Sequence, residues 1–451
     1  MKPNWVTFAQ RPVPRYTSYP TAADFAPAVG EGESRAWAAG VAPGSAISVY
    51  AHIPFCERLC WYCGCATTVP NGYGRIAAYV GVLHKEVDLW AEALGPHGGL
   101  AHLHLGGGSP NSLSADDMGG LIGHISRRFG LRPDAEIAME LDPRVLSEAQ
   151  VKAMAAAGVN RVSLGVQTLS AQVQTAINRL QPREQVERVI ACLNAAGISQ
   201  HNMDLMYGLP GQTVSDVEEA AAFAVLHKAA RVSVFGYAHV PWFAKHQKAI
   251  DADALPGLEA RFEQAEAATS VLRAAGYELI GLDHFARADD PLTLAAREGR
   301  LRRNFQGYTD DPHATLIGIG ATSISQFREG FVQNLKDRKS WGEAIAAGRL
   351  PVERGIALTD DDRLRARAIE QLMCQLSVDA RAVCREMGAA EGSLDGALER
   401  ARALVPAGLC DVDGSLVTVP PAARPFLRTV AQCFDGRTPV VEGAARHAKA
   451  V

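Results

Sequence analysis

The stretch ISVYAHIPFCERLCWYCGC (residues 47–65) places four cysteines within ten residues, directly after a strand-like run. The run ISVYAHI is rich in β-branched and aromatic residues, which favours a β-strand. The cysteines follow the spacing C-x3-C-x2-C-x-C, whereas the other five of the nine cysteines are isolated. Clustered thiols in a reducing compartment more often hold metal than form disulfides. We therefore expect a metal-binding loop at the carboxyl end of the first strand.

Further strand-like runs follow and alternate with helical stretches rich in Ala and Leu. These runs are 100–106, 136–141, 161–166, 201–207, 231–237 and 277–282. Strands that alternate with helices form βα units and a parallel sheet. Six or seven such units in about 240 residues favour a full or partial (βα) barrel over a single Rossmann unit.

Both ends of the chain differ in composition from this region. Residues 1–44 are rich in Pro, Gly and Ala, which is typical of an arm rather than a domain. Near the other end, Thr359 and the acidic residues after it predict the start of a helix. The sequence LCDVDGSLVTV (409–419) predicts a hairpin that turns at Asp413-Gly414. We expect an N-terminal arm (1–44), a catalytic domain (45–350) and a mostly helical C-terminal domain with a small hairpin (351–451).

The charge balance bears on the possible partners. The 45 Lys and Arg residues against 49 Asp and Glu residues give no electrostatic reason to expect nucleic acid. Helices plus a hairpin resemble a winged-helix module, but residues 361–451 hold twelve acidic and twelve basic residues, without the basic surplus of a DNA binder. A structural cap on the barrel is favoured. Since the sequence shows no signal peptide and no apolar span, we expect a cytoplasmic protein with no nucleic-acid or membrane partner.

The cysteine loop could hold either of two kinds of metal site. Structural zinc sites usually combine two cysteine pairs from separate knuckles, and four ligands within ten residues are hard to arrange around one ion. In a cubic iron–sulfur cluster, three thiolates from one loop can each bind a different iron. The ferredoxin run C-x2-C-x2-C-x3-C-P is absent, which disfavours a simple electron carrier. An iron–sulfur cluster with one iron open to a small molecule is the favoured interpretation.

Candidate ligand residues follow the later strands at the same end of the predicted barrel, where barrel enzymes carry out their chemistry. Three consecutive glycines in LHLGGGSPNSL (103–113) let the backbone approach a ligand closely. Each residue alone could be structural, but their shared location favours a ligand site. They are Gly106, Gly107 and Gly108, then Glu140, Gln167, Arg179 and Asp204. We interpret His52, His102, His104 and His239, which lie in or beside strands, as scaffold residues before metal ligands.

The spacing C-x3-C-x2-C, with Tyr62 before the third cysteine, resembles the radical S-adenosylmethionine (SAM) superfamily. In that superfamily SAM chelates the open iron, and the reduced cluster cleaves it to methionine and a 5′-deoxyadenosyl radical. Along most of its length the chain resembles the oxygen-independent coproporphyrinogen III oxidases, also called coproporphyrinogen dehydrogenases. The resemblance rests on RYTSYPTA (15–22), VYAHIPFCERLCWYCGC (49–65), HLGGGSP (104–110), MELDPR (139–144), SLGVQ (163–167), NMDLMYGLPGQT (202–213), SVFGYAHVP (233–241), DHFAR (283–287), RNFQGYT (303–309), IGIGATSIS (317–325) and RGIALT (354–359).

This resemblance implies a fold and a reaction. The fold is α/β, a partial (βα)6 TIM-like radical SAM barrel with an N-terminal arm and a mostly helical C-terminal domain. The reaction is oxidative decarboxylation of two propionate side chains of coproporphyrinogen III to vinyl groups, which gives protoporphyrinogen IX in haem biosynthesis. It implies a [4Fe-4S] cluster and two bound SAM molecules, with an unidentified electron donor and acceptor. We expect a monomer.

The resemblance also implies roles for particular residues. Cys56, Cys60 and Cys63 would ligate the cluster, whereas Cys65 would have a catalytic or structural role. The first SAM would contact Tyr50, Gly107, Glu140, Ala238 and Ile324. The second would contact Tyr62, Gly108, Ser109, Gln167, Arg179 and Asp204. Gly236 departs from the pattern, because an Asn is usual there.

Two other functions are compatible with parts of this sequence. A related haem chaperone would use the same loop without decarboxylation, but such relatives generally lack the fourth cysteine and the RYTSYPT arm, both of which this chain has. A redox-sensing regulator would act through the winged-helix-like tail, and the neutral charge of that tail argues against it.

Overall fold

The computed structural model describes residues 5–437, so the last fourteen residues of the expected C-terminal domain lie outside it. Its centre is a run of six parallel strands that lie side by side in chain order. They are β1 (Ile47–Ile53), β2 (Leu100–Gly107), β3 (Leu131–Leu141), β4 (Arg161–Gln167), β5 (Gln200–Tyr207) and β6 (Arg231–Gly236). The predicted partial (βα)6 barrel is confirmed, and β1 has the bounds expected from its sequence.

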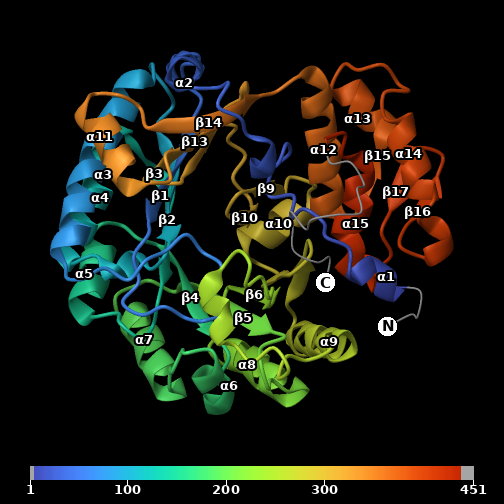
Figure 1. The fold of residues 1–451 in the computed structure, drawn as a ribbon, viewed down its shortest axis with the longest axis horizontal. Helices are drawn as coiled ribbons and strands as arrows, with labels where there is room; N and C mark the ends of the chain where they lie inside the picture. Colours follow the sequence, from blue (N-terminus) through green and yellow to red (C-terminus); the bar gives the residue numbers. More distant parts are fainter. Residues whose placement is uncertain (1–4, 438–451) are drawn as a thin grey trace.

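Helices cover the outer face of these strands, on the left and lower sides of Figure 1. They are α3 (Gly74–Ala93), α4 (Ala115–Arg128), α5 (Glu148–Ala156), α6 (Ala171–Ala176), α7 (Arg183–Ala195) and α8 (Val214–Leu226). Helix α4 shows why they form: Ser114 caps it by accepting the Asp117 N–H, and Met118, Leu121 and Ile125 are buried at helical spacing. The main hydrophobic core lies between these helices and the sheet.

Shorter strands extend the sheet at both edges. Beside β1 lie β11 (Leu316–Ile319), parallel to it, then β12 (Ile324–Gln326), β13 (Gly330–Asn334) and β14 (Val352–Ala357), which are antiparallel. Helix α9 (Leu258–Ala274) leads to the other edge, where β8 (His284–Ala286) lies between β6 and β7 (Glu278–Ile280). The run 277–282 is therefore no seventh βα unit, because the chain reverses near Gly281, at φ +56°, and pairs antiparallel. Within residues 5–437, no ladder joins β14 to β7, so the barrel is open.

The C-terminal segment stands on the side of the sheet away from the outer helices (Figure 1). It contains α12 (Asp360–Gln375), α13 (Ala380–Glu386), α14 (Asp395–Arg402), α15 (Leu427–Ala431) and a small sheet of β15 (Ser377–Asp379), β17 (Leu416–Thr418) and β16 (Asp411–Asp413). The predicted cap at Thr359 is confirmed, since its side chain accepts the Asp362 N–H. The predicted hairpin is also confirmed and turns at Gly414, whereas β15 had no sequence prediction.

The N-terminal arm packs against this segment. It holds the helices α1 (Val6–Ala9) and α2 (Glu31–Ala39), and Trp5, Tyr16 and Tyr19 are buried in the core of the C-terminal segment. The proposed domain boundaries stay predictions. Among the described residues, no helix has the length and apolar character needed to span a membrane.

Candidate active site

The cysteine loop leaves the carboxyl end of β1 and is anchored by hydrogen bonds along its length. The Cys56 N–H donates to the Thr68 carbonyl (3.0 Å), and the Cys63 N–H donates to the Cys60 carbonyl (3.2 Å). Gln247, from the segment after β6, donates through its side-chain amide to the Tyr62 carbonyl (2.9 Å). These bonds hold the thiols in a fixed loop rather than on a mobile segment.

All four cysteines of the loop are free thiols. Burial raises the pKa of Cys56 to about 11, partly offset by its hydrogen bond with Thr67. Hydrogen bonding from Cys65 lowers the pKa of Cys63 to about 6, and the Cys65 backbone N–H lies 3.4 Å from the Cys63 sulfur. The thiolate is the metal-binding form of cysteine.

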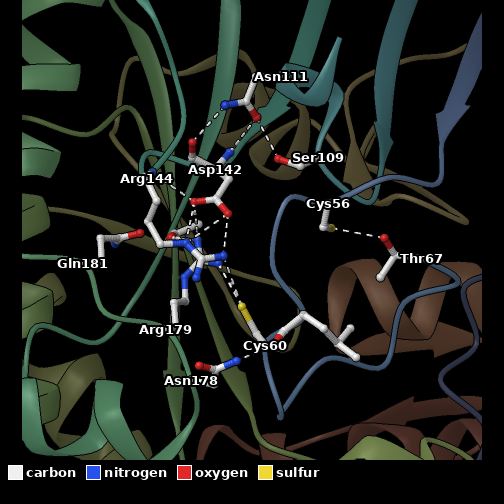
Figure 2. A network of polar contacts seen from close by, with 12 residues as sticks. Cys56, Cys60, Thr67, Ser109, Asn111, Asp142, Arg144, Asn178, Arg179 and Gln181 are labelled. Carbon is white, nitrogen blue, oxygen red and sulfur yellow. Dashed lines mark hydrogen bonds and ion pairs between the residues drawn. The ribbon is translucent and has the colours of Figure 1, made fainter. Parts of the chain in front are cut away.

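Two arginines converge on the sulfur of Cys60, as Figure 2 shows. Arg144 Nη2 donates to it from 3.3 Å and Arg179 Nη1 from 3.4 Å. Asp142 holds both guanidinium groups, at 2.6 Å from Arg144 and 3.5 Å from Arg179. Asn111 fixes the Asp142 backbone with two hydrogen bonds. Burial would raise the pKa of Asp142, but the two arginines lower it overall, so the carboxylate is charged.

The glycines at the end of β2 form a cradle with no room for side chains. A Cβ on Gly107, which has φ +111°, would lie 2.4 Å from the His52 ring. A Cβ on Gly108 would lie 2.6 Å from the Phe55 carbonyl oxygen. The Gly107 N–H instead donates to Glu140 Oε2 (3.1 Å). Both glycines line the cavity, so a ligand there meets backbone without an intervening side chain.

Glu140 lies beside this cradle at the end of β3. Burial would raise its pKa, but the hydrogen bonds from His104 and from the Gly107 N–H lower it overall. An ionised carboxylate at this position can accept hydrogen bonds from an ammonium group or from ribose hydroxyls. By contrast, burial raises the pKa of Asp204 on β5, which accepts hydrogen bonds from Ser163 and Asn202.

A cavity of about 720 Å³ opens at the carboxyl ends of the parallel strands. The structure brings together around it all four cysteines of the loop and most of the predicted SAM contacts. The predicted residues in its wall are Cys56, Cys60, Cys63, Cys65, Tyr62, Gly107, Gly108, Ser109, Glu140, Gln167, Arg179, Asp204 and Ala238. Gly236 also lines it, and a Cβ there would lie 2.9 Å from the Tyr207 ring.

Two predicted residues lie outside the cavity wall. Tyr50 is on β1, where its ring stacks on His104 and its hydroxyl lies 3.1 Å from His52 Nδ1. Ile324 is on β12 and packs against the small core that contains Phe331. Their SAM contacts stay predictions.

Several residues of the site had no prediction. Asp142, Arg144 and Asn111 order the surroundings of Cys60, and the first two lie in the segment MELDPR that carried the resemblance. Trp242 and Phe243 line the cavity although 64% and 77% of their surfaces are exposed. Their exposed apolar surface at the cavity is typical of a binding surface, and this exposure could not be read from the sequence.

The donor set fits an iron–sulfur cluster better than one zinc ion. Ligands of a tetrahedral zinc–thiolate site lie about 3.8 Å apart. Among the described residues, the cysteine sulfurs form no group of three within 4.8 Å of one another, as expected for thiolates that bind different irons. The Arg179 Nε is buried without a hydrogen-bond partner among the described residues, which leaves a donor for a ligand in the cavity.

Comparisons with known proteins agree with this geometry. The family model of the radical SAM superfamily matches residues 50–224. The chain is 43% identical to an oxygen-independent coproporphyrinogen III oxidase of Bradyrhizobium diazoefficiens, over 99% of both chains, and 41% identical to one of Paracoccus denitrificans, over 94% of both. The solved coproporphyrinogen III oxidase of Escherichia coli, described as a radical SAM enzyme, aligns with a TM-score of 0.89 and 34% identity, covering 94% of this chain and 98% of that one. The chain belongs to the oxygen-independent coproporphyrinogen III oxidase family of radical SAM enzymes.

Proposed function

We propose that the protein decarboxylates two propionate side chains of coproporphyrinogen III to vinyl groups without oxygen, giving protoporphyrinogen IX in porphyrin biosynthesis. The observation that carries this proposal is one cavity lined by the cysteine loop, the glycine cradle and the acidic strand ends, in a chain matched over 99% of its length by an oxidase. When bound, a [4Fe-4S] cluster supplies the electron that cleaves SAM to methionine and a 5′-deoxyadenosyl radical.

Cys56, Cys60 and Cys63 would hold the cluster. The guanidinium groups of Arg144 and Arg179 place positive charge next to the Cys60 sulfur, which stabilises its thiolate. We assign Cys65 a role other than iron ligation, with its backbone N–H directed at the Cys63 sulfur from 3.4 Å. A Cys65→Ser variant should therefore keep its full iron content and lose turnover, and loss of iron would instead make Cys65 a ligand.

Two SAM molecules would share the cavity. The cradle and the ionised Glu140 suit the first, because both offer polar groups to an amino-acid ammonium group or a ribose. Arg179, Gln167 and Asp204 line the same cavity from the ends of later elements, and the guanidinium group would pair with the carboxylate of the second. Anaerobic equilibrium dialysis should find two SAM per reconstituted chain. One SAM per chain would contradict this assignment and leave the proposed reaction intact.

The cavity mouth suits an apolar macrocycle with carboxylates at its rim. Trp242 and Phe243 offer exposed aromatic surface to the flat face of a tetrapyrrole. Arg15, from the N-terminal arm, and Arg58, from the cysteine loop, also line the cavity. Neither guanidinium group has an ion-pair partner among the described residues, so both are available to propionates. The proposal includes an external electron donor and acceptor and a monomer that acts in the cytoplasm.

An anaerobic assay tests the reaction. The reconstituted protein is given a reductant, SAM and coproporphyrinogen III, and protoporphyrin and 5′-deoxyadenosine are measured together. Both products should form, and Cys56→Ala should abolish both, whereas Cys192→Ala on α7, outside the cavity wall, should not. Deoxyadenosine without protoporphyrin would overturn the substrate assignment. Neither product from a chain with a complete cluster would favour a haem-binding chaperone.

A further inference from the structure

A second group of metal-ligating side chains lies toward the opposite end of the barrel. His102 is on β2, two residues before His104 and on the same face of the strand, so it lies about 7 Å farther from the cysteine end. Asp311 and His313 lie in the loop between β10 (Gly307–Thr309) and β11. One ligand atom from each of the three side chains lies within 4.8 Å of the other two. Within residues 5–437, these three residues form the sole group of this kind.

The carboxylate of Asp311 is buried with little charge compensation. It is 8% exposed, and its ion-pair partner among the described residues is His102, with 3.8 Å between Nε2 and Oδ1. The Ser48 hydroxyl, from β1, donates to the other carboxylate oxygen. A buried carboxylate usually has an arginine, a lysine or a metal ion beside it. A divalent cation at this point would supply the missing positive charge.

The loop directs its ligands toward β2. Asp311 Oδ1 accepts the backbone N–H of His313 (2.9 Å), which turns the chain back on itself. The His313 and His102 rings then lie 6.0 Å apart between centroids.

The observed spacing is close to that of a bound metal. Two ligands of a tetrahedral zinc ion, each about 2.0–2.1 Å from the metal, lie about 3.3–3.4 Å apart. The 3.8 Å between His102 Nε2 and Asp311 Oδ1 needs a contraction of about 0.5 Å to reach that value, and the other two ligand pairs, which lie within 4.8 Å, need at most about 1.5 Å. Rotation of the two histidine side chains, which are half-buried, can supply this movement toward the buried Asp311.

We propose that His102, Asp311 and His313 bind one divalent transition-metal ion, with Zn²⁺ as the best match to two imidazoles and a carboxylate. A water molecule would take the fourth position. Three protein ligands and a water are the arrangement of catalytic zinc sites, but the amino-terminal end of a (βα) barrel serves stability rather than catalysis, so we assign the ion a structural role. It ties β2 to the loop that leads into β11, and β11 pairs with β1, the strand that carries the cysteine loop.

Zinc analysis of the holoenzyme tests this site. Untagged full-length protein is reconstituted anaerobically so that the cluster occupies the thiols, then incubated with Zn²⁺ and desalted. We expect one zinc per chain in the wild type and less than a tenth of that in His102→Ala and in His313→Ala. His227→Ala is the matched control, because His227 lies 3.6 Å from Glu187 without a third ligand in the described chain, and it should keep the zinc.

A thermal measurement completes the test. Zn²⁺ at a hundred times its dissociation constant should raise the melting midpoint of the wild type by about 2–4 °C and leave both variants unchanged. Unaltered iron content in the variants would show that they fold. If the variants lose iron, the wild type is titrated with Zn²⁺ in a calorimeter instead. Binding of Zn²⁺ at one site with micromolar or tighter affinity would support the proposal. Wild-type protein without bound zinc, or variants that keep as much as the wild type, would overturn it.

Discussion

Replacement of Asp142 by Asn tests whether this carboxylate organises the positive charge beside Cys60. Asn has nearly the shape of Asp and leaves both backbone hydrogen bonds to Asn111 in place, so the variant removes the charge and one of the two acceptor oxygens. The side chains of Arg144 and Asp142 are 8% and 11% exposed, and that of Arg179 is 7% exposed. The variant would leave two buried guanidinium groups next to each other without their shared partner.

The expected cost follows from this burial. Removing one partner of a buried ion pair destabilises a protein by about 3–5 kcal/mol. A chain of this length has an unfolding entropy of about 0.9 kcal/mol per kelvin, so the melting midpoint should fall by about 3–6 °C. The measurement is differential scanning calorimetry of the cluster-free, thiol-reduced protein, which separates this effect from metal binding.

Asp289→Asn is the matched control. Arg287 also donates to Asp289 through both Nε and Nη2, at 3.1 and 2.6 Å, but these side chains are 45% and 70% exposed. Exposed ion pairs contribute little to the free energy of unfolding, so this variant should have the same melting midpoint as the wild type. Equal midpoints for Asp142→Asn and Asp289→Asn would refute the view that Asp142 balances a buried charge cluster.

Three further predictions concern other parts of the chain. Gly107→Ala should weaken SAM binding at least about tenfold, because of its positive φ and the clash with His52. Gly44→Ala is the control, because Gly44 has φ +89° but lies in open space, and it should bind SAM normally. Equal SAM affinities for the Gly107→Ala and Gly44→Ala variants would contradict the role of Gly107 in SAM binding. Burial raises the pKa of Glu86 to about 7, so the folded state holds its proton longer than the unfolded state. Relative to Glu86→Gln, the wild type should lose about 3 kcal/mol of stability as pH rises from about 4.5 to about 7. Calorimetric melting midpoints that change equally with pH in both proteins would exclude this effect. Trp242→Ala should raise the KM for coproporphyrinogen about tenfold with little change in kcat, as expected for about 1.4 kcal/mol of lost apolar contact. An unchanged KM in steady-state kinetics would show that Trp242 does not contact the substrate.

The parallel core could be predicted because each of its strands has apolar residues at successive or alternating positions. The run 47–53 forms a strand with those bounds, and the capping pattern at Thr359 starts a helix as expected. The strands β12 and β7 have three residues each, too few for a periodic pattern. Their antiparallel pairing depends on tertiary contacts, so the run 277–282 was wrongly assigned to a βα unit.

The site was predictable where one residue type has a strong chemical meaning. The cysteine spacing and the triple glycine pointed to the loop and the cradle, and the structure places both at one cavity. The role of Arg144 depends on the three-dimensional approach of β3 to the cysteine loop, which spacing along the chain does not encode. The pairing of His102 with the loop before β11 was missed for the same reason, because more than 200 residues separate them in sequence.

The stoichiometry of the anaerobic reaction tests the central claim most directly. In the presence of reductant, SAM and coproporphyrinogen III, 5′-deoxyadenosine and protoporphyrinogen IX are counted in the same reaction mixture. The proposed mechanism predicts two molecules of deoxyadenosine for each protoporphyrinogen, one for each vinyl group. Protoporphyrinogen formed without deoxyadenosine, or formed equally by Cys56→Ala, would contradict it.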